Sequence, residues 1–333
     1  MNESRIYDNH GRPIDYVRIA VTDRCNLRCF YCMPAEGITY VNRKDLLSYE
    51  EISRLVAILA EMGVRKVRIT GGEPFLRRDL MFLLEKIVST RGIEAVHITT
   101  NGVLTAPHVP ALKAMGIKSI NLSLDTLDRQ RFMEMTRRDE LPKVQECLEA
   151  LLANGISTKI NAVVMEGKNV EDIIPLTELG RKDPVEVRFI EEMPFNGAGA
   201  NYPRLAWNHR RILQELKSHY PEIHKIPDPD HSTSENYQIP GFAGTVGIIP
   251  AFTRTFCGTC NRIRLTAVGQ LKTCLYDDGV LDIRALLRSG AADGEIRTAF
   301  LKAFSNRAKD GYEAEKRRSA DRPVNESMST IGG

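Results

Sequence analysis

Short strand-like runs alternate with amphipathic helical stretches between Tyr16 and Glu192, and this alternation restricts the fold more than any other feature of the sequence. The pattern reads YVRIAVT, EEISRLVAILAEMG, VRKVRIT, RDLMFLLEKIVST and EAVHITT, then continues through IKSINLSL, two helical stretches, ISTKINAVV and VEVRFIEE. Strands and helices that alternate in this way form parallel sheets. The six strands predict an α/β fold with an incomplete (βα)6 barrel of the TIM type, because a closed barrel needs eight units.

The rest of the chain is expected to close the open side of this barrel. It predicts a helix around Trp207, short strands in TVGIIP, NRIRLTAVG and QLKTCLY, and helices near Ile283 and Ile296. We therefore expect a partial barrel over 1–195 and a C-terminal α+β extension over 196–308. The tail over 309–333 mixes opposite charges and lacks an apolar face, so we expect it to be mobile in isolation.

The charge balance argues against nucleic acid and membranes as partners. The 333 residues carry 46 basic and 43 acidic side chains, a formal net charge of +3, which gives no global field suited to a polyanion. No apolar run approaches the roughly 18–20 residues that span a bilayer, and the first residues lack the apolar stretch of a signal peptide. The sequence predicts a soluble, cytoplasmic protein.

Seven cysteines, an odd number in a long chain, indicate metal ligation or catalysis and not disulfides. Cys25, Cys29 and Cys32 lie in DRCNLRCFYCMP, directly after the first predicted strand, where a barrel carries its active-site loops. Three thiolates leave one iron of a cubane cluster open for a further ligand. Zinc is the alternative, but local zinc pairs usually have the spacing C-x2-C, so the spacing favours the cluster.

A second set, Cys257, Cys260 and Cys274, lies in FCGTCNRIRLTAVGQLKTC. Its spacing fits an iron-sulfur cluster, and it also fits a structural zinc knuckle completed by a distant residue, because nothing local identifies the metal. Cys147 lies alone in the predicted helix KVQECLEALLANG and is interpreted as a buried small hydrophobe.

Basic side chains recur on one face of the predicted strands. In VRKVRIT, Lys66 and Arg68 alternate with Val67 and Ile69, so the cations point into the barrel if the apolar residues face the helices. The same parity applies to Arg18, Lys159 and Arg188, and to the pair Arg262 and Arg264. Uncompensated buried ions cost several kcal/mol, and a triphosphate would supply the counter-charge. Phosphate binding would rest on side chains, since the sequence has no GxxxxGK[ST] loop.

Several motifs together carry a specific resemblance. TDRCNLRCFYC, RITGGEP, TNG, NLSLDTLD with MTRRD, CGTCNRIRLT, Cys274 and the terminal Gly332 and Gly333 occur in one order and spacing. Over essentially the whole chain, the sequence resembles the GTP 3',8-cyclase family of radical S-adenosylmethionine (SAM) enzymes, which act in molybdenum cofactor biosynthesis. The segment 196–207 is the least similar, and no site is assigned there.

The resemblance implies two [4Fe-4S] clusters, one on each cysteine set, the first binding SAM and the second contacting the guanine of GTP. The residues that it places at SAM are Tyr31, Gly72, Ser123 and Met193. Glu73 offers a carboxylate that could meet the SAM amine, although GGEP could also be a simple turn. The residues that it places at GTP are Arg18, Lys66, Arg68, Thr99, Lys159, Arg188, Arg262 and Arg264. Gly332 and Gly333 would enter the active site and support hydrogen abstraction.

The implied reaction is that of a lyase. A 5'-deoxyadenosyl radical removes the ribose C3' hydrogen of GTP, and the sugar radical adds to C8 to give 3',8-cyclo-7,8-dihydroguanosine 5'-triphosphate. An electron donor and a downstream cyclic pyranopterin monophosphate synthase are the implied partners, and a homodimer is one candidate assembly. Two alternatives stay open at this point. One is a radical SAM enzyme that modifies peptides and carries an auxiliary cluster, and the other is a zinc-stabilised nucleotide-binding scaffold.

Overall fold

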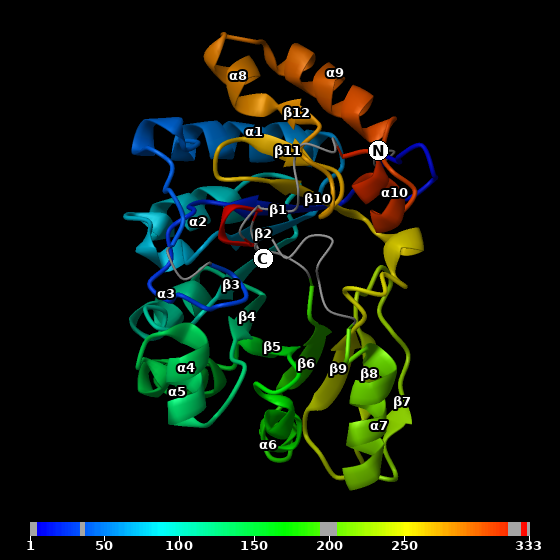
Figure 1. Cartoon of the computed structure of the whole chain (residues 1–333). Helices are drawn as coiled ribbons and strands as arrows, with labels where there is room; N and C mark the ends of the chain where they lie inside the picture. The colour runs from blue at the N-terminus through cyan, green and yellow to red at the C-terminus, as the bar shows by residue number, and fades with distance from the viewer. Residues whose placement is uncertain (1–4, 34–36, 194–204, 319–327, 332–333) are drawn as a thin grey trace.

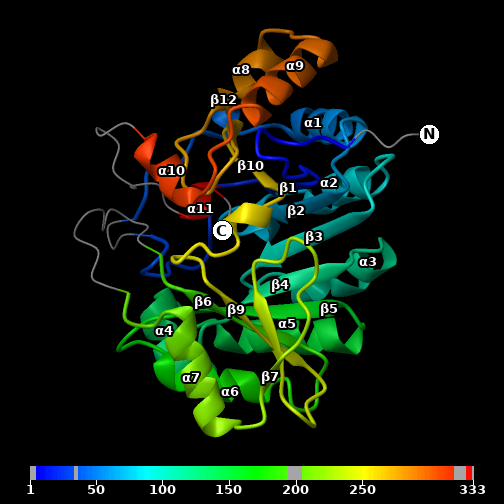
Figure 2. The same ribbon diagram turned by 90° about the vertical axis from the view of Figure 1, so that its right-hand side faces the viewer.

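The core of the protein is a twelve-stranded sheet (Figure 1). The computed structural model describes residues 5–33, 37–193, 205–318 and 328–331. Six parallel strands follow one another through the first part of the chain: β1 (Tyr16–Ala20), β2 (Lys66–Thr70), β3 (Ala95–Thr100), β4 (Ser119–Ser123), β5 (Ser157–Val164) and β6 (Glu186–Glu191). Figure 2 shows this succession from β1 to β5 down the molecule. The predicted partial βα barrel is confirmed.

Helices connect these strands and cover the outer face of the sheet. They are α1 (Tyr49–Glu61), α2 (Leu80–Val88), α3 (Val109–Ala114), α4 (Arg129–Thr136), α5 (Leu141–Ala153) and α6 (Ile173–Glu178). Short 3-10 turns are η1 (Arg43–Asp45), η2 (Pro74–Leu76), η3 (Ala106–His108), η4 (Val170–Asp172) and η6 (Cys257–Thr259). Helix α1 begins at a capping box, in which the Ser48 hydroxyl accepts from Glu51 N and the Glu51 carboxylate accepts from Ser48 N.

The strand parity decides which side chains face the helices. Val67 and Ile69 of β2 are fully buried, as are Val17 and Ile19 of β1, in one continuous apolar core. Residues two apart on a strand share a face, so the alternate positions point to the other side of the sheet. There Arg18 is the register partner of Arg68. Burial of the apolar residues of β1 and β2 therefore turns Arg18 and Arg68 to the other side of the sheet, which is the predicted inward basic face.

The C-terminal extension adds strands at both ends of the six-stranded sheet. Its elements are α7 (His209–His219), β7 (His224–Lys225), β8 (Glu235–Gln238), β9 (Thr245–Ile249), β10 (Arg262–Leu265), β11 (Gln270–Lys272), β12 (Leu281–Asp282), α8 (Ile283–Arg288), α9 (Asp293–Phe304), α10 (Gly311–Lys316) and α11 (Met328–Ile331). Strand β10 pairs in parallel with β1, and β9 pairs in parallel with β6. The extension thus continues the barrel wall from both of its edges.

Two short helices lie within the predicted tail, α10 and α11. Ile331 is almost fully buried in a small apolar cluster with Tyr276, Ala308 and Ala314. The described part of the tail is thus helical and packs against the extension. Gly332 and Gly333 lie outside the described residues.

Candidate active site

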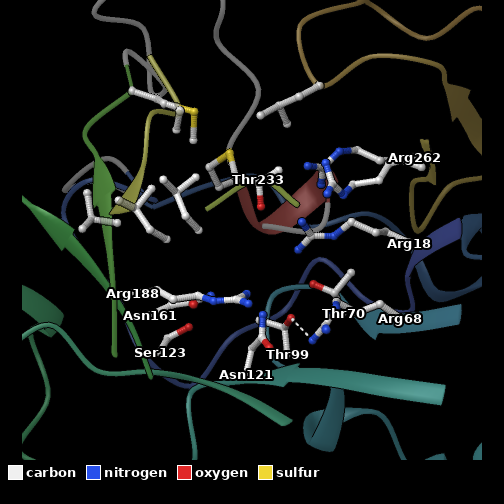
Figure 3. Close-up of a pocket in the computed structure, with 18 of the residues that line it drawn as sticks. Arg18, Arg68, Thr70, Thr99, Asn121, Ser123, Asn161, Arg188, Thr233 and Arg262 are labelled. Atoms are coloured by element: carbon white, nitrogen blue, oxygen red, sulfur yellow. Dashed lines mark hydrogen bonds between the residues drawn. The ribbon is translucent and has the colours of Figure 1, made fainter. Parts of the chain in front are cut away.

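One cavity of about 560 Å³ lies inside the partial barrel and brings the sequence motifs together. All three cysteines of each set line it, as do residues from strands β1 to β6 and β10. Figure 3 shows Arg188 entering the space from one side and Arg18 and Arg262 from the opposite side. Residues separated by more than 200 positions in the sequence, such as Cys29 and Cys260, therefore share one chamber.

The first cysteine set is half-buried on the loop after β1. Burial and the nearby Glu73 carboxylate raise the pKa of the Cys25 thiol to about 12. Asn101, from the TNG motif, donates from Nδ2 to Cys25 Sγ at 3.5 Å. Burial also raises the pKa of Cys29. These groups stay protonated unless a bound metal ionises them, since a coordinating thiol is deprotonated.

The second set comes together where η6 meets the end of the β10–β11 hairpin. Cys257 begins η6, Cys260 directly follows it, and Cys274 comes two residues after β11. None of the seven cysteines forms a disulfide, and Cys147 is fully buried in the apolar core, as expected. Cys260 is the thiol whose pKa is lowered: burial opposes this, but the charges of Arg262 and Arg307 outweigh it.

The side chains predicted to contact GTP all line the same cavity. They are Arg18, Lys66, Arg68, Thr99, Lys159, Arg188, Arg262 and Arg264. Burial and the neighbouring Arg264 lower the pKa of Arg18, which shows how closely these cations are packed. Glu186 forms ion pairs with both Lys159 and Arg188 and so neutralises part of the charge. Glu186 is two residues before Arg188 on β6, and the sequence interpretation did not identify it.

Tyr16 is a cavity residue that the sequence interpretation missed. Its ring lies 5.4 Å from Lys66 Nζ and 5.9 Å from the Arg262 guanidinium, and its hydroxyl accepts from Arg68 Nε at 2.6 Å. Burial alone would raise the pKa of Tyr16, but Arg68, Arg18 and Arg262 outweigh it and lower the pKa to about 8. The available signal was its position two residues before Arg18, on the same face of β1.

Comparison with known proteins accounts for both parts of the chain. Residues 19–180 match the radical SAM superfamily, and residues 185–313 match the family described as Molybdenum Cofactor Synthesis C. The GTP 3',8-cyclase of Chlorobaculum tepidum is 39% identical over 328 residues, which cover 98% of this chain and 96% of that protein. The chain belongs to the GTP 3',8-cyclase family.

Some relatives of this GTP 3',8-cyclase family member are longer. Molybdenum cofactor biosynthesis protein 1 of Bos taurus is 40% identical over 290 residues, which cover 87% of this chain and 46% of that protein. The chain thus spans about half the length of the animal relatives that it matches. Among solved structures, Streptococcus suis SuiB shares the fold, with a TM-score of 0.61 and 16% identity over 93% of this chain and 70% of that one. No helix in the described ranges is long and apolar enough to cross a membrane.

Four of the five residues expected at SAM line the cavity: Tyr31, Gly72, Ser123 and Met193. Gly72 allows its loop to lie against the cysteine loop, because a Cβ there would be 2.3 Å from Arg24 O. At Gly71 a Cβ would be 2.6 Å from Thr22 O. The two glycines therefore serve backbone packing as well as any approach to a ligand.

Glu73 is not among the residues that line the cavity. It is fully buried, and its carboxylate accepts from Asn101 N at 2.7 Å, from the Thr100 hydroxyl at 2.9 Å and from Phe75 N at 3.1 Å. Burial raises the pKa of Glu73 to about 7. In this structure Glu73 joins the GGEP loop to the TNG loop.

Asp125 is a second cavity residue that the sequence interpretation missed. Its carboxylate accepts from the Tyr31 hydroxyl at 2.7 Å and from Val163 N at 2.8 Å. It thereby fixes the aromatic residue between Cys29 and Cys32, and burial raises the pKa of Asp125 to about 6. The available signal was an acidic residue in NLSLDTLD, just past the end of β4.

Proposed function

We propose that this protein is a radical SAM enzyme that cyclises GTP to 3',8-cyclo-7,8-dihydroguanosine 5'-triphosphate, the first step of molybdenum cofactor biosynthesis. The observation that carries the proposal is one chamber lined by two three-cysteine sets and a wall of cations. GTP is the substrate named by the relatives of nearly full coverage. In the proposal the sulfonium cofactor binds beside the first cysteine set and the triphosphate binds to the cations.

The proposal assigns a [4Fe-4S] cluster to each of the two donor sets. A single zinc ion, with Zn–S distances of about 2.3 Å, would need its ligands gathered around one point. Among the described residues, no three His, Cys, Asp or Glu side chains are gathered in that way. In a cubane cluster each thiolate binds a different iron, so a wider spacing suits it. Cys25, Cys29 and Cys32 would hold the first cluster, and Cys257, Cys260 and Cys274 the second.

The protein's own residues would bind and orient the reactants. The chemistry that a reduced cluster and SAM supply when bound is one-electron cleavage of SAM to a 5'-deoxyadenosyl radical. Tyr31, Ser123 and Met193 would hold SAM at the first set, while Arg18, Arg68 and Arg264 would hold the phosphates of GTP. Holding the ribose at a fixed place beside SAM is what directs hydrogen abstraction to one carbon. Gly332 and Gly333 would assist from the tail.

Deuterium labelling tests the proposed reaction directly. The protein is reconstituted without air with iron and sulfide, then given reductant, SAM and GTP deuterated at C3'. We expect deuterium in 5'-deoxyadenosine, and none when the label is at C2'. Label recovered from C2', or 5'-deoxyadenosine formed equally without GTP, would overturn the proposal. The second of these outcomes would favour a peptide-modifying enzyme instead.

The pKa of Tyr16 predicts how GTP binding depends on pH. A phenolate among the cations would repel the triphosphate, so GTP should bind best to the protein with the neutral phenol. As the pH rises through about 8, Tyr16 ionises and the affinity for GTP should fall, up to about tenfold per pH unit. His97 does not interfere, because burial and the nearby cations lower its pKa to about 3.

The measurement is anaerobic calorimetry of GTP binding between pH 7 and pH 9.5, with wild type and Tyr16→Phe side by side. The phenylalanine variant keeps the ring beside Lys66 and Arg262 but cannot ionise. Titration of GTP itself affects both proteins equally, so the difference between the two curves reports Tyr16. Parallel curves would show that Tyr16 does not titrate in this range.

A further inference from the structure

Three buried charged side chains lie next to the second cysteine set, and none belongs to the motifs that define the site. Asp8 and Arg12 come from the N-terminal segment, and Arg307 follows α9. The exposed fraction of each side chain is 6% or less. Buried ions at this depth are costly unless they are paired and hydrogen-bonded. Their arrangement therefore needs a physical reason.

The Asp8 carboxylate holds both arginines. Asp8 Oδ2 accepts from Arg12 Nε at 2.6 Å and from Arg307 Nη1 at 3.2 Å. Asp8 Oδ1 accepts from the backbone N–H groups of Arg12 and His10. Although burial opposes it, the contacts with Arg12 hold the pKa of Asp8 below its usual range. One carboxylate thus fixes the directions in which two guanidinium groups point.

The two arginines bind the backbone of every segment that carries a cysteine of the second set. Arg12 Nη1 donates to Cys257 O at 3.0 Å. Arg307 Nη1 donates to Cys260 O at 2.8 Å, and Arg307 Nε donates to the carbonyl of Thr273, the residue before Cys274, at 2.9 Å. These planar groups reach several acceptors at fixed angles, which a lysine cannot do.

Arg307 also reaches a ligand sulfur. Its Nη2 lies 3.3 Å from Cys260 Sγ and donates as well to Arg262 O at 2.8 Å. Hydrogen bonds to ligating sulfurs raise the reduction potential of iron-sulfur clusters, because they stabilise the added negative charge. A cationic donor at this place would act in the same direction. Arg307 therefore has two separable effects: it positions the segments of Cys260 and Cys274, and it changes the charge at the Cys260 sulfur.

We propose that Asp8, Arg12 and Arg307 are positioning residues that preorganise the second cysteine set, and that Arg307 tunes the reduction potential of the cluster through Cys260 Sγ. The inference rests on the proposed function, since it takes Cys257, Cys260 and Cys274 as cluster ligands. Outer residues of this kind orient ligands and typically change metal affinity ten- to hundredfold when they are replaced. These three lie outside the substrate cavity, so they act through the cysteines and not on GTP.

The test uses the full chain with Cys25, Cys29 and Cys32 replaced by alanine, so that only the second cluster contributes signals. Into this parent we introduce Arg307→Gln, Arg307→Lys and Asp8→Asn. Arg77→Lys is the matched control for Arg307→Lys, because Arg77 also donates to backbone carbonyls, Val21 O and Leu47 O, but away from the second set. After anaerobic reconstitution, iron content, iron loss to a chelator and the midpoint potential are measured, the last by redox titration followed by electron paramagnetic resonance.

We expect iron loss roughly tenfold or more faster in Asp8→Asn and Arg307→Gln than in the parent. We also expect a more negative midpoint potential in Arg307→Gln. The shift in midpoint potential should be smaller in Arg307→Lys, which keeps the positive charge but loses the planar set of donors. Arg77→Lys should match the parent. If Arg307→Gln does not fold, the lysine variant still reports the potential.

Unchanged potentials and unchanged iron retention in the Arg307 variants would overturn the inference. Equal iron loss in Arg77→Lys and the Arg307 variants, with no shift in potential, would also overturn it, because it would indicate general destabilisation. A parent protein that takes up no iron at all would instead refute the proposed second cluster. The two failures are therefore distinguishable.

Discussion

Replacing Cys25, Cys29 and Cys32 together by alanine will abolish the reductive cleavage of SAM and leave about half of the iron bound. The three thiols are the only cysteines on the loop after β1, and they line the cavity together. Without them no donor set remains beside Tyr31 and Ser123. The measurement is 5'-deoxyadenosine by chromatography, together with iron per chain after anaerobic reconstitution.

Two further variants make this result specific. Replacing Cys257, Cys260 and Cys274 should remove the other half of the iron and end cyclisation. Cys147→Ala, whose side chain is fully buried in the apolar core, should keep both clusters. Continued SAM cleavage in the first triple variant, or iron for one cluster only in the unmodified protein, would contradict the assignment of the two sets.

Arg264→Ala and Arg68→Ala should each weaken GTP binding about ten- to hundredfold and change SAM binding much less. A hydrogen bond to a charged group contributes about 1.5–3 kcal/mol, and 1.4 kcal/mol corresponds to a factor of ten in affinity. Both side chains line the cavity from neighbouring parts of the basic wall, on β10 and β2. Arg68 also donates to Ile98 O at 3.0 Å, which sets its direction before any ligand binds.

Anaerobic calorimetry with GTP and with SAM measures the two affinities separately. Arg129→Ala is the control, because Arg129 is two-thirds exposed and pairs with Asp139 on the surface. It should leave both affinities unchanged. If both cavity variants kept the wild-type affinity for GTP, the inward face of the strands would not be the triphosphate site.

The sequence predicted those features that depend on local pattern. The six strands and the inward basic face follow from period-two alternation, because a fully buried Val67 or Ile69 forces Arg68 to the opposite side. The strands β9, β10 and β11 were also predicted, since each is a short β-branched or aliphatic run. Strands β7 and β8 were not, because HK and ENYQ are too short and polar to stand out.

Features that depend on distant contacts were beyond sequence reasoning. Asp8 and Arg307 are 299 residues apart, and no periodicity links them. Glu73 was expected at the ligand because its motif follows a strand, and no local pattern indicated the hydrogen bonds that it accepts from Asn101 and Thr100. Tyr16 had the right parity, yet its importance comes from cations that belong to β2 and β10.

The outer strands of the sheet have a consequence for how the chain matures during translation. Strand β1 ends at Ala20, but one of its two neighbours, β10, begins only at Arg262. Strand β6 ends at Glu191, and its neighbour β9 begins only at Thr245. At about 5–20 residues per second, the ribosome needs roughly 10–50 s to deliver β10 after β1. During that time both open edges of the nascent sheet can recruit other chains. Slower elongation between β6 and β10 should therefore lower the soluble yield, and molecular chaperones that shield strand edges should restore it.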